Sequence, residues 1–473
     1  MLNLHRSRNG LGTRRELLKS ATCGFGYLAL ADLLCRTSAA DEAPNPLAPK
    51  MPQFPAKAKQ VIFLFMHGGP SQIDTFDYKP QLEKDHGKPL PFDKPRVFSA
   101  ATGNLLKSPW AFKQYGESGA WVSDIFPHVG SQADKLCIIN GMHGSNSRHG
   151  GALLELHTGS DTFVRPSMGS WITYGLGTEN QDLPGFITMC PTLTHGGVNA
   201  YSSAFLPAVY QGTPLGNASI PSDQASIPYI KNAAETPRDI QRKELDFLRQ
   251  FNTEHLAETG PDSNLEGRIN AFELAFRMQS AAPELQDISD ETEATLKMYG
   301  IDQNETKNFG RQCLMARRFI ERGVRFVQCT HSYKWDQHSN LKVDHAKNAL
   351  EVDLPIAGLL ADLEARGLLK ETLVLWGGEF GRTPVAQGDD GRDHNPQGYT
   401  MWLAGGGIKP GIRYGATDEY GYYAIQNKVH IHDLHATMLH LLGMDHLKLT
   451  YRYAGRDFRL TDIHGEVVEG IIA

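Results

Sequence analysis

The strongest constraint on the fold of this chain is a continuous apolar run without polar alternation, Val61–Met66. A strand that is covered on both faces of a parallel sheet has this pattern, because neither face meets water. The run ends at His67 and two glycines, and Asp74 follows closely. Because ligands of open α/β sheets bind beyond the carboxyl ends of the strands, His67 and Asp74 are candidate site residues. A core or capping histidine is the alternative for His67.

Two further apolar runs enclose the most polar loop of the chain. The runs Thr372–Trp376 and Tyr399–Ala404 have the length and the β-branched or aromatic content of buried strands. The loop between them is predicted to handle a metal or an anionic substrate. Its candidate side chains are Glu379, Arg382, Asp393 and His394. A solvated surface loop is the alternative.

A third cluster follows the predicted strand Val324–Cys329. Asp336 and His338 stand two residues apart on the loop after it, and an extended chain points both side chains to one side. A carboxylate and an imidazole are ordinary ligands of a divalent cation. The pair therefore predicts a metal site, and His345 is placed to orient one of its ligands.

A further predicted strand, Lys135–Ile139, leads through a turn rich in Ser and Asn to a short helix over Ala152–His157. A helix N-terminus stabilises anions, so Ser145 and Ser147 are candidates for nucleophilic attack or phosphate binding. Simple capping of the helix is an equal alternative. Three basic side chains lie close to them in the sequence: His143, Arg148 and His149.

The segment Val429–Gly443 is predicted to be a helix that Asp433 caps and Gly443 ends. It carries several histidines, of which His430, His432 and His435 are candidate metal ligands. Orientation of ligands or packing beside a metal site is the alternative for these side chains.

The first forty residues are predicted to be a targeting signal and not a part of the fold. The pair Arg14-Arg15 precedes a moderately apolar run, Ala21–Leu34, and small residues at 38–40 offer a cleavage site. Residues 1–40 are therefore predicted to be a twin-arginine signal peptide, and 41–57 a linker. We expect a periplasmic or secreted protein. An amphipathic N-terminal helix is the alternative.

The composition is that of an ordinary globular protein, with 40% apolar and 21% charged residues among 473. A net charge of −6 offers no basic surface, so nucleic acid is not an expected partner. After the N-terminal segment no apolar run approaches the roughly 18 residues of a membrane-spanning helix. The four cysteines of the remaining chain lack zinc-site spacing and are predicted to be buried thiols: Cys137, Cys190, Cys313 and Cys329.

In combination the motifs resemble a known family. HGGPSQIDTFD, WDQHSN, GGEFGRTP, GRDHNP and HDLHATMLHLLG follow the order of the alkaline phosphatase and sulfatase superfamily, and within it they resemble the secreted domain of unknown function 1501 family. The resemblance covers residues 58–465 as one domain, with a helical insertion at about 237–322. It implies an α/β three-layer sandwich with a mostly parallel central sheet and helices on both faces.

The resemblance also implies roles for single residues. Asp336, His338 and His394 match one metal site, and Glu379 with His67 or Asp74 matches a second. A formylglycine sulfatase has a cysteine at the place where this chain has Gly144–Arg148. The nucleophile candidate is therefore Ser145, and Arg382 or Arg148 is expected to hold the anion.

Two functions follow as hypotheses. The first is an exported metal-dependent hydrolase of phosphate or sulfate esters, with small-molecule or glycan esters as substrates and Zn, Mn, Ca or Mg as the divalent metal ion. The second is a non-catalytic binding or envelope-associated protein that retains the fold.

Overall fold

The computed structural model describes residues 45–93, 101–228, 230, 236–260 and 262–473. The predicted signal peptide and the first residues of the predicted linker lie outside this part of the chain. Among the described residues, no helix combines the length and the apolarity needed to cross a membrane.

The core of the fold is a mostly parallel sheet. Its strands run in the order β13-β5-β12-β9-β1-β8-β6-β7, with β16 beside β5. Only β12 is antiparallel to its neighbours, β5 and β9. The strands are β1 (Gln60–Met66), β5 (Leu136–His143), β6 (Phe186–Met189), β7 (Thr213–Leu215), β8 (Phe326–His331), β9 (Thr372–Gly377), β12 (Tyr399–Ala404), β13 (Ile412–Tyr414) and β16 (Val429–His430).

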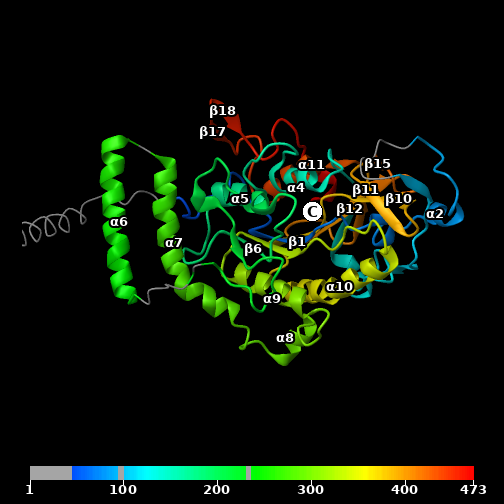
Figure 1. The fold of residues 1–473 in the computed structure, drawn as a ribbon, viewed down its shortest axis with the longest axis horizontal. Helices are drawn as coiled ribbons and strands as arrows, with labels where there is room; N and C mark the ends of the chain where they lie inside the picture. The colour runs from blue at the N-terminus through cyan, green and yellow to red at the C-terminus, as the bar shows by residue number, and fades with distance from the viewer. Residues whose placement is uncertain (1–44, 94–100, 229, 231–235, 261) are drawn as a thin grey trace, which may run out of the picture.

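Helices cover both faces of this sheet (Figure 1). On one side lie α4 (His149–Thr158), α5 (Met168–Leu176) and α11 (Ile431–Leu441). On the other lie α9 (Lys307–Glu321) and α10 (Leu341–Ala365). The expected α/β sandwich with a mostly parallel central sheet is confirmed.

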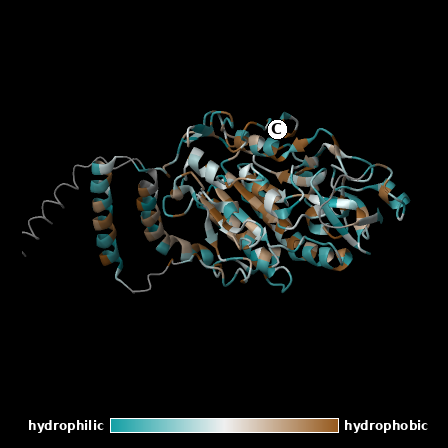
Figure 2. Ribbon diagram, turned by 45° about the horizontal axis from the view of Figure 1, so that its top comes forward, coloured by the Kyte–Doolittle hydropathy of each residue, from teal (hydrophilic) through white to brown (hydrophobic). Residues whose placement is uncertain are grey.

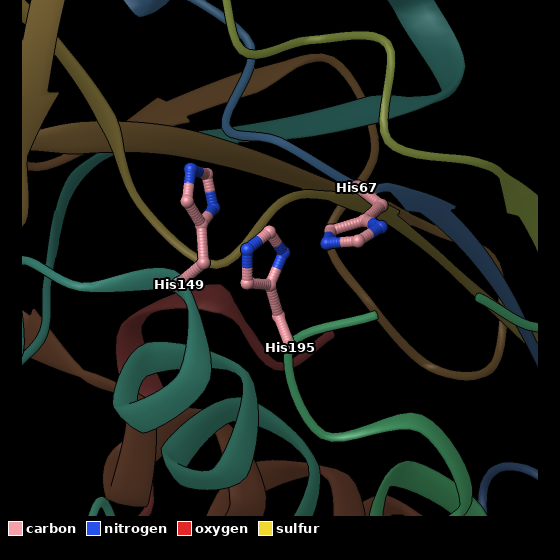
Figure 3. A group of neighbouring side chains, drawn as sticks. All are labelled: His67, His149 and His195. Carbon is pink, nitrogen blue, oxygen red and sulfur yellow. The ribbon is translucent and has the colours of Figure 1, made fainter. Parts of the chain in front are cut away.

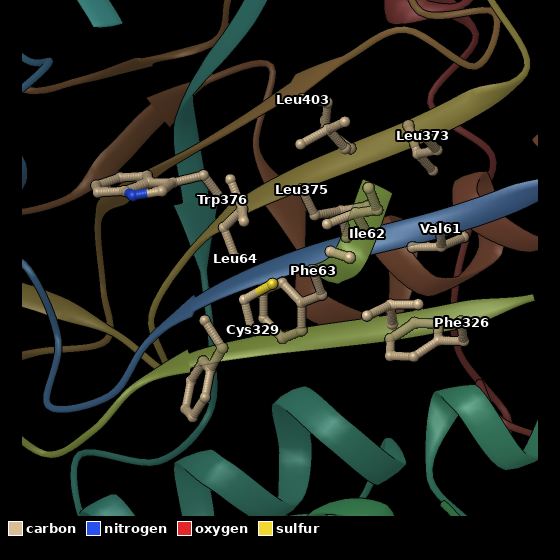
Figure 4. Packing of buried hydrophobic residues seen from close by; sticks show 14 of the residues in the cluster. Val61, Ile62, Phe63, Leu64, Phe326, Cys329, Leu373, Leu375, Trp376 and Leu403 are labelled. Carbon is tan, nitrogen blue, oxygen red and sulfur yellow. The ribbon is translucent and has the colours of Figure 1, made fainter. Parts of the chain in front are cut away.

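Strand β1 is buried along its whole length, as its apolar sequence predicts. Figure 4 shows Ile62 and Phe63 of β1 among side chains of the neighbouring strands, including Phe326 of β8 and Leu375 of β9. The surrounding strands are likewise apolar, whereas the helix α6 is largely hydrophilic (Figure 2). Most side chains within the strands are therefore apolar, and the buried polar exceptions include Asn140 of β5 and Gln328 of β8.

The carboxyl ends of the three central strands meet at one edge. Met66 of β1 is in register with His331 of β8, and Phe65 is in register with Gly377 of β9. Because β12 is antiparallel to β9, its beginning lies at this same edge, so that His394 precedes the sheet where the other strands leave it. Loops that are far apart in the sequence are brought together here.

The polar segment between β9 and β12 is not the expected loop. It forms a hairpin of β10 (Gly381–Gln387) and β11 (Gly391–Asn395), which joins β2 (Thr102–Leu105) in a second sheet. Its Arg392 is buried where it bonds to Asp74, outside the hairpin, and to the Thr383 carbonyl, and composition alone does not reveal these contacts. The strands β3 (Phe112–Tyr115) and β4 (Ala120–Ser123) also form a hairpin.

The predicted helical insertion at about 237–322 is indeed helical. It contains α6 (Arg238–Thr259), α7 (Ser263–Gln286), α8 (Glu293–Met298) and α9. In Figure 1, α6 and α7 stand side by side as an arm beyond the end of the sheet. No side chain of α6 among the described residues is buried.

Two local predictions are resolved by the structure. Helix α11 is capped by His430, and Asp433 bonds back to the His430 backbone as the second half of a capping box, so the predicted Asp433 cap is wrong by three residues. The four cysteines are free and buried, as predicted.

Candidate metal centre

One carboxylate oxygen, Oδ1 of Asp336, lies at the centre of a group of imidazoles. The Nε2 atoms of His149, His338 and His394 lie 3.2, 3.0 and 3.1 Å from it. His149 is the first residue of α4, and the other two come from the loop after β8 and from β11. The edge of the sheet therefore gathers one acidic and three imidazole side chains.

Each of these imidazoles has an acceptor at its other nitrogen. Nδ1 of His149 donates to Oε1 of Glu379 at 2.6 Å, and Nδ1 of His394 donates to the Ser147 carbonyl at 2.7 Å. Nδ1 of His338 meets the Gln387 side-chain oxygen. A proton on Nδ1 leaves the Nε2 lone pair of a neutral imidazole free for a cation. Three lone pairs thus converge on Asp336, with their partners fixed as in known metal sites.

The spacing fits a bound cation. Ligand atoms of His149, Asp336 and His394 all lie within 4.8 Å of one another. Metal–ligand bonds of about 2.0–2.1 Å in a tetrahedral site imply ligand atoms about 3.3 Å apart. The 3.1–3.2 Å contacts of Asp336 with these two histidines are close to that value. His338, with 31% of its side chain exposed, lies on the open side of the group.

The groups around the centre keep the carboxylates of Asp336 and Glu379 ionised. Burial disfavours the charged forms, but the three neighbouring imidazoles and the Arg382 guanidinium together hold the pKa of Asp336 well below its ordinary value. Burial also disfavours the ionised Glu379, but the His149 bond and the neighbouring His67 and His149 rings together lower its pKa to about 2. Burial also disfavours a charged His149, but its two carboxylate partners outweigh this effect and raise its pKa. Burial lowers the pKa of His394.

Arg382 bonds to Asp336 and to the backbone around it. Its guanidinium donates to Oδ1 of Asp336 at 2.6 Å and to the carbonyls of Gly69, Trp335 and Arg392 at 2.9, 3.1 and 3.2 Å, and it is 1% exposed. It also contacts the Gly68 carbonyl. With its donors engaged in this way, Arg382 has contacts that favour positioning of Asp336 over the expected role of holding a substrate anion.

A second group of imidazoles adjoins the first and shares His149. One nitrogen from each of His67, His149 and His195 lies within 4.8 Å of the other two (Figure 3). The His149 and His195 rings stack at 4.9 Å, and Tyr333 packs against His67 and His195 at 4.8 and 4.7 Å. The Tyr333 hydroxyl donates to Oδ2 of Asp336 at 2.9 Å, which links the two groups.

Most of the predicted metal ligands meet at this edge, but their roles differ. Asp336, His338 and His394 surround one point, as expected. Glu379 bonds to His149 and to the Gly68 N–H, so it orients a ligand. His67 lies in the adjoining group.

Asp74 does not reach the centre. It is 0% exposed, and Arg392 donates to its Oδ2 and Oδ1 at 2.6 and 3.2 Å. The Ser71 hydroxyl donates to Oδ2 at 2.5 Å. Asp74 bonds to a guanidinium and a hydroxyl and, unlike Asp336, belongs to neither group of possible metal ligands among the described residues, so the expectation of a metal ligand here is not supported.

Ser145 faces a different cluster. Its hydroxyl lies 3.1 Å from Nε2 of His430, and its backbone N–H donates to the buried Glu155 carboxylate at 2.9 Å. The His432 N–H donates to Nδ1 of His430, so the His430 proton is on Nε2 and this nitrogen cannot accept the hydroxyl proton of Ser145. Ser145 is therefore not activated as a nucleophile by His430.

Arg148 is the residue that precedes α4, and it is exposed. Its N–H donates to the Asn146 side chain at 2.9 Å, and no Ser or Asn side chain caps the helix itself. Its expected role of holding an anion stays a prediction.

The histidines of α11 form hydrogen bonds with backbone groups. His432 and His435 bond through Nε2 to the carbonyls of Gly159 and Leu156 at 2.9 and 2.8 Å. Together with the capping role of His430, these contacts match the packing alternative.

Sequence reasoning missed His149, His195 and Tyr333 as site residues. His149 is signalled only by its place at the start of a helix that follows a buried strand. His195 lies before two glycines in the irregular segment after β6, where its φ of 52° is in the left-handed region.

Comparison with known proteins gives the family. No curated protein matches the chain. Solved structures that match include the lipoteichoic acid synthase LtaP from Listeria monocytogenes (10% identity, 88% of this chain and 78% of that chain, TM-score 0.38). They also include the PsFucS1 sulfatase from Pseudoalteromonas sp. (13%, 81% and 68%, TM-score 0.37) and a protein in the alkaline phosphatase superfamily from Vibrio parahaemolyticus (9%, 88% and 74%, TM-score 0.33). The family described as "Protein of unknown function (DUF1501)" matches residues 58–472, and the chain therefore belongs to this family.

Proposed function

We propose that this protein is an exported metal-dependent hydrolase of phosphate or sulfate esters. The observation that carries the proposal is the set of three imidazoles whose Nδ1 atoms face acceptors and whose Nε2 atoms meet at Asp336. Structural histidines bond to the nearest carbonyl through either nitrogen: His432 and His435 use Nε2, and His157 uses Nδ1. A common orientation toward one carboxylate oxygen is what a metal site requires.

The donor set indicates the kind of metal. Imidazole nitrogens suit Zn²⁺ and other transition metals, whereas Ca²⁺ and Mg²⁺ prefer oxygen ligands. Of the four ions expected from the sequence, Zn or Mn therefore fits better than Ca or Mg. When bound, a divalent cation polarises an ester oxygen and neutralises the charge of the leaving group.

The residues of the chain supply position and charge. Arg382 and Tyr333 hold the two oxygens of Asp336, and Glu379 fixes the ring of His149. The carboxylates of Asp336 and Glu379 and the Arg382 guanidinium together carry one net negative charge. A divalent ion would make this set positive by one unit, which favours an anionic substrate.

The remaining features of the proposal rest on the sequence. The motif resemblance to the phosphatase and sulfatase superfamily supports ester hydrolysis, and small-molecule or glycan esters are the proposed substrates. The Arg14-Arg15 pattern supports export to the periplasm or the medium.

The alternative is a metal-binding protein without turnover. The contacts of Ser145 favour it, because the expected nucleophile is turned toward His430 instead of the metal centre. Fold and metal binding alone do not imply catalysis.

Metal analysis and an ester panel test the proposal. Protein purified from its native compartment is expected to hold at least one divalent ion per chain and to hydrolyse aryl phosphates, phosphodiesters or sulfates. His394→Ala should lose both properties, while His255→Ala on the exposed face of α6 should keep them. Metal without turnover on any ester supports the alternative. Less than one ion per chain, or full turnover in His394→Ala, contradicts the assigned centre.

A further inference from the structure

The starting point is the tautomer of His67, which is opposite to that of the three imidazoles around Asp336. The backbone N–H of Tyr333 donates to Nδ1 of His67 at 3.2 Å. A neutral imidazole that accepts at Nδ1 carries its proton on Nε2. His67 therefore presents an N–H donor, and not a lone pair, from its Nε2 atom.

This donor has no acceptor in the described part of the chain. His67 is 0% exposed, and its Nε2 atom is buried without a hydrogen-bond partner. An unsatisfied buried donor costs about 1–3 kcal/mol, so such groups are rare in folded proteins unless a ligand completes them. The expected metal-ligand role does not complete it, since a cation needs the lone pair that the proton occupies.

His195 supplies a second unsatisfied nitrogen in the same place. Its Nδ1 atom is also buried without a partner, and its ring lies 5.8 Å from that of His67. Figure 3 shows the two side chains approaching from different elements, His67 from the end of β1 and His195 from the segment after β6. One nitrogen of each ring lies within 4.8 Å of the other, so both belong to one polar cluster.

His195 is held there by an unfavourable backbone conformation. Its φ of 52° is uncommon for a residue with a side chain, and such conformations cluster at ligand sites. Tyr333, which packs against both rings, has a φ of 27°. Both segments hold their rings over His149, which belongs to the metal centre.

The groups around His67 and His195 suit an anionic ligand. The His67 N–H seeks an acceptor, and Nδ1 of His149 is already committed to Glu379. The oxygens of the neighbouring Asp336 face its imidazole, guanidinium and hydroxyl partners. An oxygen with negative charge that approaches the metal from this side would meet the N–H of His67.

We propose that His67 and His195 form an oxyanion subsite beside the metal centre, which binds the phosphate or sulfate group of the substrate. This inference rests on the proposed function for the identity of the substrate, but anion binding can be measured without turnover. In this subsite His67 is a hydrogen-bond donor to the ligand, which replaces its expected role as a metal ligand.

Binding of inorganic phosphate and inorganic sulfate by the metal-loaded full-length protein tests the subsite. In calorimetric titrations, His195→Ala and His67→Phe should each weaken binding of the preferred anion by about tenfold, the effect of one lost hydrogen bond to a charged group. The comparison of the two anions identifies the substrate class. His255→Ala, which removes an exposed imidazole of α6, is the matched control and should bind as the wild type does.

Two further measurements separate an anion-binding role from a metal-ligand role. His67→Gln places an amide N–H near the position of Nε2 and should restore part of the affinity that His67→Phe loses. Metal content must stay at the wild-type value in His195→Ala and in His67→Gln. In the wild-type protein, ¹⁵N chemical shifts of the histidine rings should report the proton of His67 on Nε2, which does not depend on the folding of any variant.

The outcomes are distinct from those of the proposed function. Loss of metal in His195→Ala or His67→Gln, unchanged anion affinity in His195→Ala, or a wild-type protein that binds neither anion overturns the subsite. A wild-type protein that binds phosphate or sulfate through these histidines but hydrolyses no ester overturns the proposed hydrolase and supports the subsite. Hydrolysis whose KM is unaffected by His195→Ala supports the hydrolase and overturns the subsite.

Discussion

Asp336 and Asp74 are two acidic residues that follow buried central strands, yet they have opposite surroundings. Asp336 faces three imidazoles whose other nitrogens are already bonded, and its side chain is 15% exposed. Asp74 is enclosed by Arg392 and Ser71 and is 0% exposed. Both carboxylates pair with a guanidinium, Arg382 for Asp336 and Arg392 for Asp74, but only Asp336 also faces imidazoles that can bind a cation.

The difference shows which property separates a carboxylate of the metal centre from a structural carboxylate. Position at a strand end is common to both, and burial is greater for the structural one. What distinguishes Asp336 is that its imidazole partners are titratable and have their Nδ1 protons fixed by Glu379, Gln387 and Ser147. A guanidinium, by contrast, cannot be replaced by a metal without leaving its own charge unpaired.

The largest effect is expected for Asp336→Asn. The amide keeps the size of the side chain but removes the charge that a cation needs, so metal affinity should fall by more than about 1000-fold, beyond the roughly 10–100-fold that outer partners contribute. Metal content after dialysis and ester hydrolysis measure this loss. Retention of one ion per chain would mean that Asp336 is only the partner of Arg382.

Asp74→Asn should produce the reverse result. It leaves the fully buried Arg392 without its counter-charge, which typically costs about 3–5 kcal/mol of unfolding free energy. Chemical denaturation measures this loss, and the folded fraction should still hold the wild-type amount of metal. A double variant, Asp74→Leu with Arg392→Met, should recover part of the stability because no buried charge is left unpaired. Loss of metal in folded Asp74→Asn would remove the distinction between the two carboxylates.

Glu379→Gln tests the partners that orient the ligands. The amide oxygen can still accept from Nδ1 of His149, but without the charge that strengthens the bond, so metal affinity should fall by about 10–100-fold. Competition with a chelator of known affinity gives the value. An unchanged affinity would show that Glu379 is not needed to set the tautomer of His149.

His149 makes the metal centre sensitive to pH in a defined direction. Its pKa is raised above 6.5 in the metal-free protein by Asp336 and Glu379, and a cation must displace the Nε2 proton. Metal affinity should therefore rise by about tenfold per pH unit up to the raised pKa and then level off. Proton release, measured by calorimetry in buffers of different ionisation enthalpy, reports this displacement.

The metal-free protein should respond to pH in the opposite sense. Because the pKa of His149 is higher in the folded than in the unfolded chain, the stability from its ion pairs is fully present below about pH 6.5. It is lost as the pH rises through the folded pKa. Denaturation of chelator-treated wild type and of His149→Gln across this range checks the assignment, since the variant should lack the trend.

Much of this fold was predictable from the sequence, because buried parallel strands such as Val61–Met66 are apolar without interruption. Their ends then locate Asp336 and His394 by the topology of the sheet alone. The hairpin of β10 and β11 was not predictable in this way, since its buried Arg392 meets its partner Asp74, which lies far away in the sequence, only after folding.

The division of roles within the site was also beyond the sequence. Asp74 and Asp336 are indistinguishable in the sequence, and only their partners in the fold show that imidazoles surround Asp336 and not Asp74. The roles of His149 and Glu379 are set in the same way: the helix start places the His149 ring 3.2 Å from Asp336, and Glu379 bonds to the other nitrogen of that ring.

The smallest effect is expected for Ser145→Ala, which extends the comparison to the expected nucleophile. The hydroxyl is exposed and contacts His430, whose Nε2 carries the proton, so its loss removes one surface hydrogen bond and should change the unfolding free energy by no more than about 0.5–1 kcal/mol. Metal content and ester turnover should stay within about twofold of the wild type, because a truncation outside the site has only small effects. Ser147→Ala is the matched control, since only the backbone carbonyl of Ser147 contacts His394. A loss of turnover in Ser145→Ala at full metal content would show that this loop turns its hydroxyl toward the metal during the reaction, and the hydrolase would then follow the serine-nucleophile route expected from the sequence.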